Sequence, residues 1–69
     1  MEREYVRSSN LKSIGYDDNN QILEIEFNHG GVYRYFGVPE DVHYELMTAN
    51  SKGSYFSSHI KNIYRTQKL

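Results

Sequence analysis

The clearest pattern in the chain is a strict alternation of apolar and acidic residues that ends at position 27. Leu23, Ile25 and Phe27 alternate with Glu24 and Glu26. Successive side chains of a β-strand point to opposite faces, so this spacing predicts a strand with one apolar face and one face in water.

A second alternating segment precedes this strand. Within residues 11–16, Ile14 and Tyr16 share one face, and the turn-forming cluster Asp17-Asp18-Asn19-Asn20 follows. This turn could be a two-residue or a four-residue loop. The two lengths differ by two residues, so both leave each side chain of the second alternating segment on the same face of the sheet. Ile14 and Tyr16 are therefore expected on the apolar face of the first strand.

A third strand is predicted after the glycine pair, with Tyr33 and Tyr35 on one face. If residues 29–31 form a three-residue loop, Phe27 lies opposite Tyr33, and both tyrosines join the apolar face. A four-residue loop would turn Arg34 toward the core, where an unpaired charge costs several kcal/mol. We prefer the three-residue loop, which sets Arg34 on the wet face, beside one of the two strand glutamates.

Helical spacing begins after Val38-Pro39. Proline suits the first turn of a helix, and acids such as Glu40 are favoured there by the helix dipole. Val42, Leu46 and Ala49 are spaced i, i+4, i+7, which predicts a helix over about residues 39–49.

A second helix is predicted from residue 53 or 54 to residue 64. The polar run Asn50-Ser51-Lys52-Gly53 separates it from the first helix. The apolar residues expected along one of its faces are Phe56, Ile60, Ile63 and Tyr64.

These elements predict one α+β domain over residues 1–69: an antiparallel three-stranded β-meander followed by two helices packed on one face. Residues 1–10 form either a fourth, edge strand or a loosely held arm. A domain of this size hides only about 60% of its chain's surface, so its core is thin.

Composition narrows the class of protein. The chain has no cysteine, which excludes disulfides and thiolate metal sites and suits the cytoplasm. No apolar run is long enough for a membrane span. The net charge is −1, with an acidic middle and a basic end, and this argues against a long nucleic-acid footprint.

The corner between the helices is a candidate anion site. Ser51, Lys52, Gly53 and Ser54 open the second helix, where unpaired backbone N–H groups attract phosphate. The alternative is that a serine only caps the helix and Gly53 only permits the turn. Lys61, further along the same helix, would add a positive charge.

Aromatic residues supply the other candidates. Tyr33 and Tyr35 could stack bases if their face were open, but the preferred register makes them core. Arg34 could bind an anion, although a cross-strand ion pair is the simpler role. Tyr55 and His59, spaced i, i+4 off the apolar stripe of the second helix, could contact a ligand or form an exposed rim.

Nothing in the sequence predicts catalysis, a metal site or a cofactor. His29, His43 and His59 lack metal-binding spacing, and no serine lies in a nucleophile elbow.

One set of residues spans nearly the whole chain. It consists of Val6, Ser8-Ser9, Ile14-Gly15-Tyr16, Leu23 through Phe27, Tyr33-Arg34-Tyr35, Val38-Pro39, Ala49, Ser51, Gly53, Tyr55-Phe56, Ile60 and Tyr64. This set resembles the KTSC domain family, which occurs as a C-terminal extension of some lysyl-tRNA synthetases and as a stand-alone small protein. From the resemblance we expect the α+β fold over nearly the whole chain and a role in RNA binding.

Three functions remain open. The first is a non-catalytic binding module for a phosphate-bearing ligand, either single-stranded RNA or a small nucleotide. The second is a small homo-oligomer, of the kind a phage could encode, that sequesters a nucleotide signal molecule. The third is a protein–protein docking domain.

Overall fold

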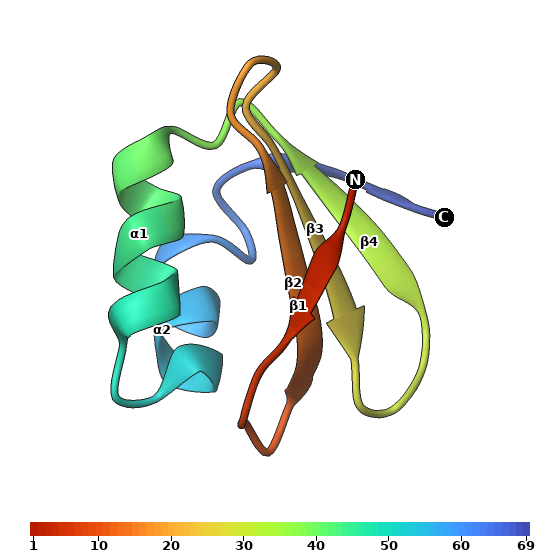
Figure 1. The fold of residues 1–69 in the computed structure, drawn as a ribbon, viewed down its shortest axis with the longest axis vertical. Helices are drawn as coiled ribbons and strands as arrows, with labels where there is room; N and C mark the ends of the chain where they lie inside the picture. Colours follow the sequence, from red (N-terminus) through yellow and green to blue (C-terminus); the bar gives the residue numbers. More distant parts are fainter.

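The protein is a two-layer α+β domain, with two helices on one face of an antiparallel sheet (Figure 1). A computed structural model describes residues 1–69. The elements in chain order are β1 (Arg3–Tyr5), β2 (Leu11–Asp17), β3 (Ile22–Phe27), β4 (Val32–Phe36), α1 (Glu40–Thr48), α2 (Lys52–His59) and β5 (Arg65–Lys68).

The sheet has five strands in the order β1-β2-β3-β4-β5, each antiparallel to its neighbours. Its centre is the predicted meander, and the predicted α+β class is confirmed. The N-terminal segment forms the edge strand β1 rather than an arm. The four-residue option for the β2–β3 loop is the observed one, because Asp17 pairs with Ile22.

The register predicted for the β3–β4 hairpin was wrong by two residues. Ile25, not Phe27, lies opposite Tyr33. The loop is longer than predicted because Gly30 and Gly31 both take positive φ, at 108° and 89°, a conformation open to glycine. A shift of two preserves the face of every side chain, so both tyrosines still face the helices.

The core lies between the sheet and the helices. Leu46 of α1 and Phe56 of α2 are the buried residues of the two helices. The buried cluster comprises Leu11, Ile14, Leu23, Ile25, Phe27, Tyr35, Val38, Leu46, Phe56 and Ile60.

The first helix agrees with its prediction to within one residue at each end, with Pro39 at the N-cap. The second helix is shorter than predicted and ends at His59. The N–H groups of both Ile60 and Lys61 donate to the carbonyl of Phe56, and the chain then turns away. Ile63, predicted on the buried face, is 63% exposed.

The residues after this turn form β5, which was not predicted. Its sequence, Arg65-Thr66-Gln67-Lys68, has no apolar alternation. It becomes a strand because the outer side of β4 offers unpaired backbone groups, with Phe36 opposite Arg65. Neither helix is long and apolar enough to cross a membrane.

Candidate functional site

The first candidate surface is a shallow hollow at the start of α2. The Ser51 hydroxyl accepts the backbone N–H of Ser54 at 3.2 Å and donates to the Ser54 hydroxyl at 3.0 Å. Ser51 is therefore the N-cap of the helix. The N–H groups of Lys52 and Gly53 have no acceptor within the protein.

Serine and asparagine side chains line this hollow, which has a volume of about 370 Å³. We call it the serine hollow. It brings the predicted residues of the corner together with residues that sequence reasoning missed, because the β1–β2 turn folds against α2. Its lining consists of Ser9, Asn10, Ser51, Gly53, Ser54, Ser57 and Ser58.

Lys52 does not take the role predicted for it. Its ammonium turns back toward the end of α1 and donates to the Ala49 carbonyl at 3.5 Å, and its side chain does not line the serine hollow. Position 53 has room for a side chain larger than that of glycine. A Cβ there would lie 3.6 Å from its nearest atom, Cβ of Asn10, which is an ordinary van der Waals contact.

A second hollow, of about 330 Å³, adjoins the first. We call it the aromatic hollow. It shares Asn10 and Ser57 with the serine hollow, so the two form one continuous surface. Its lining consists of Asn10, Phe27, His29, Tyr33, Tyr35, Phe56, Ser57 and Lys61.

The rings of the aromatic hollow are packed against one another. Tyr35 is 4% exposed and belongs to the core, and this burial raises the pKa of its hydroxyl. Tyr33 is half-buried, with its ring edge-on to Phe27 at 5.4 Å. His29 is exposed and stacks on Phe27 at 5.3 Å. A planar ligand could therefore reach the His29 and Tyr33 rings.

Tyr55 and His59 lie outside both hollows. Their rings are 4.5 Å apart, and the Tyr55 hydroxyl donates to Oε1 of Glu45 at 2.9 Å. Burial, together with this hydrogen bond, raises the pKa of Tyr55 to about 12. Tyr55 thus links α2 to α1, which is a structural role.

Arg34 lies on the other face of the sheet, away from the helices. Its Nε donates to Oε1 of Glu24 at 2.8 Å, which is the predicted cross-strand ion pair. Arg3 of β1 pairs with the second oxygen of the same carboxylate. Glu24 was expected in water, but the two arginines leave it only 3% exposed.

This environment lowers the pKa of Glu24. Burial alone would raise the pKa, but the hydrogen bonds from Arg34 and Arg3 outweigh it and hold the pKa below the ordinary value. Gly15, between Arg3 and Glu24 in the sheet, makes the contact possible. A Cβ there would lie 3.0 Å from Cγ of Arg3.

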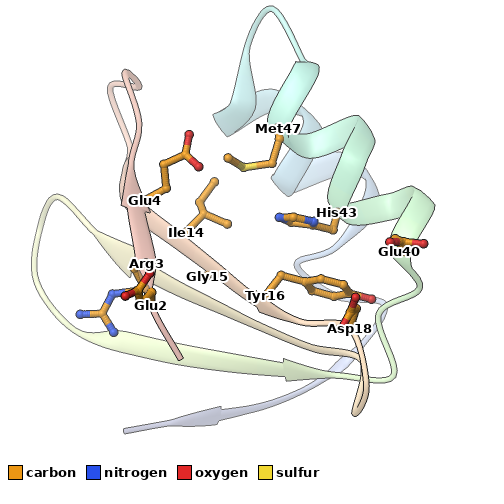
Figure 2. A pocket seen from close by; sticks show the side chains of 10 residues that line it. All are labelled: Glu2, Arg3, Glu4, Ile14, Gly15, Tyr16, Asp18, Glu40, His43 and Met47. Carbon is orange, nitrogen blue, oxygen red and sulfur yellow. The ribbon is translucent and has the colours of Figure 1, made fainter.

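A third hollow, of about 430 Å³, lies between the β1 edge and α1 (Figure 2). Tyr16 and His43 stack inside it at 4.4 Å. Burial lowers the pKa of His43, against the opposing effect of Glu4 and Glu40. The acids that line this acidic groove are Glu2, Glu4, Asp18 and Glu40. Sequence reasoning missed it, because its residues come from three separate segments.

Metal binding has no support in the geometry. No group of three or more histidine, aspartate or glutamate side chains is arranged to hold a metal ion.

The geometry defines a class of small α+β domain whose helices cover one sheet face and whose serine-rich helix start meets an aromatic hollow. The chain belongs to the KTSC domain family, whose sequence model matches residues 7–64.

Relatives cover the whole fold. A crystal structure of a KTSC domain protein from Yersinia pestis has a TM-score of 0.97 and 46% identity, covering 99% of this chain and 96% of that one. A protein of Stutzerimonas stutzeri is 46% identical over 61 residues, covering 88% of this chain and 86% of its own. A lysine–tRNA ligase of Nostoc punctiforme is 41% identical over 59 residues, which are 86% of this chain and 10% of the ligase.

Proposed function

We propose that the protein is a non-catalytic binding module for a phosphate-bearing ligand, either single-stranded RNA or a small nucleotide. The observation that carries the proposal is the continuity of the two hollows through Asn10 and Ser57. A base can stack on the exposed rings of one hollow while its phosphate meets the hydroxyls and free N–H groups of the other.

Charge supports this arrangement. Lys61 lines the aromatic hollow, and the Lys68 ammonium lies 5.9 Å from the centroid of the Tyr33 ring. No carboxylate lines either hollow. With a net charge of −1, the protein suits a contact with few phosphates rather than a long track.

The relatives favour RNA over a free nucleotide. The homologous segment is one tenth of a lysine–tRNA ligase, an enzyme whose name includes a transfer RNA. This setting, and the absence of cysteine, support a place in the cytoplasm.

Binding is tested by titrating the protein with short single-stranded RNA and with mononucleotides, using fluorescence anisotropy or calorimetry. We expect Lys61→Ala to weaken binding by about fivefold, the upper range for an exposed charge contact. His29→Ala should weaken it by about 5-fold to 150-fold, because stacking on an aromatic ring is worth about 1–3 kcal/mol per base.

Lys12→Ala is the matched control. This lysine is exposed, and its ammonium lies 3.9 Å from Glu26 rather than in either hollow. Equal losses in Lys12→Ala and Lys61→Ala would mean that binding is diffuse and that the hollows are not the site. No binding of either ligand class to the intact protein would remove the proposal.

A further inference from the structure

Both edges of the sheet are open. In the order β1-β2-β3-β4-β5 the first and last strands each have one side without a partner. All residues of both strands are exposed. Such edges present rows of free N–H and C=O groups that readily pair with another chain.

The two edges carry opposite charges on the face that bears the helices. Glu4 pairs with buried Ile14, so it lies on that face of β1. Lys68 pairs with Tyr33 and lies on the same face at the opposite edge. Arg3, on the other face of β1, is already paired with Glu24.

The acidic groove strengthens the contrast at the β1 edge. Figure 2 shows Glu4 and Glu40 on opposite sides of it, with His43 and Tyr16 between them. Residues 52–69 contain no acid at all, whereas they include Lys52, Lys61, Arg65 and Lys68.

We propose that the protein assembles head to tail, with β1 of one copy pairing in parallel with β5 of the next. Four antiparallel steps separate β1 from β5, so the two strands run in the same direction. A second copy placed beside the first, with its helices on the same side, therefore brings the two edges together in parallel.

One register matches the side chains on both faces. With Glu4 beside Lys68 of the next copy, Tyr5 lies beside that copy's Leu69 on the face without helices. Tyr5 is 75% exposed and Leu69 is 57% exposed, so the pairing would cover two apolar side chains that the monomer leaves in water. The contact joins an ion pair to an apolar pair.

Pairing of like edges is disfavoured by the same charges. Two β1 edges would bring the acids Glu2 and Glu4 of one copy near those of the other. Two β5 edges would bring Lys68 near its copy on the helix face and Arg65 near its copy on the opposite face. Like charges in register destabilise a strand pair. The unlike pairing is a heterologous contact, which closes into a ring or extends as a filament.

The test is the mass of the ligand-free protein in solution, measured by sedimentation equilibrium from micromolar to millimolar concentration at low salt. We expect an average mass that rises with concentration and falls again at high salt. Glu4→Lys and Lys68→Glu should each weaken association by about tenfold or more, because like charges then meet. Lys61→Glu, a reversal away from the edges, is the control and should leave association unchanged.

Rescue separates pairing from misfolding. The Glu4→Lys and Lys68→Glu proteins, each of which associates weakly alone, should associate more strongly when mixed, because each then offers the edge that the other lacks. The doubly reversed chain should associate with itself. A wild type that stays monomeric throughout, or reversed variants that fail to rescue each other while keeping native circular dichroism, would overturn the proposal.

Discussion

At the scale of single residues, Glu24 shows how a surface position becomes part of the core. Its side chain points away from the helices, as the alternation of β3 predicts, yet two arginines cover it: Arg34 from the neighbouring strand β4 and Arg3 from β1, which reaches across Gly15 of β2. Removing one partner of a buried ion pair leaves the other charge without compensation, which costs more than an exposed pair contributes.

We expect Glu24→Gln to lower the free energy of unfolding at neutral pH by about 1–3 kcal/mol, since its arginine partners are partly exposed. The folded-state pKa of Glu24 is lowered, so its contribution is present above the unfolded pKa of about 4.3 and is lost as pH falls through the folded pKa. Denaturant unfolding of both proteins from pH 7 to pH 2 measures this.

Glu26→Gln is the matched control on the same face of β3. Its contacts with Arg3 and Lys12 are longer, at 4.0 and 3.9 Å, so its effect should be smaller. A wild-type advantage over Glu24→Gln that persists undiminished at pH 2 would contradict the role assigned to the ion pair.

At the scale of elements, β1 depends on a glycine in the neighbouring strand. A Cβ on Gly15 would lie 2.6 Å from the Glu2 carbonyl oxygen and 3.0 Å from Arg3 Cγ. Such contacts force the backbone of β1 to move, and the movement would also pull Arg3 from Glu24. The edge strand and the ion pair are therefore coupled.

Gly15→Ala should thus destabilise the protein by about 1–3 kcal/mol, in the range of overpacked sites. It should also remove hydrogen-exchange protection from the amide of Val6, which directly follows β1 and donates to the Lys12 carbonyl of β2. Gly53→Ala is the opposite case. Its added methyl fits without clash, and alanine favours a helix by up to about 1 kcal/mol. Equal effects of the two substitutions would contradict this assignment.

At the scale of the whole molecule, the core is thin, so ligand binding should make a measurable contribution to the free energy of unfolding. A ligand at ten times its dissociation constant stabilises the protein by about 1.4 kcal/mol, which for a domain of this size raises Tm by about 6–11 °C. A thermal-shift series with RNA and mononucleotides should show this rise for the true ligand.

Salt distinguishes RNA from a mononucleotide in the same series. If two phosphates of a single strand are neutralised, affinity should fall about sevenfold between 50 and 200 mM salt. A mononucleotide held mainly by stacking should show a weaker dependence. No Tm change with either ligand would place the function elsewhere.

The sequence predicted the elements whose residues carry a period of their own. The β2–β3–β4 meander, the faces of its side chains and helix α1 follow from alternation and helical spacing, because those patterns report burial directly. The β3–β4 register could not be obtained in this way, since a shift of two leaves every face unchanged. The end of α2 was missed because Ile63 fits the apolar spacing but lies in a turn.

Only the part of the candidate site that lies in one continuous stretch of sequence was predicted. Ser51, Gly53 and Ser54 are neighbours in sequence, so their corner is visible in one stretch. Asn10 and His29 reach the same surface only through the folded chain. No local pattern indicates them.

By itself, the sequence determined which faces of its strands and helices are apolar, and with them the two-layer α+β class. The tertiary structure alone decided that a polar C-terminal segment completes the sheet as β5, that Glu24 is buried, and that the serine and aromatic hollows meet. The physical reason is that burial patterns are written locally along the chain, whereas contacts between distant polar residues exist only once the backbone has brought them together.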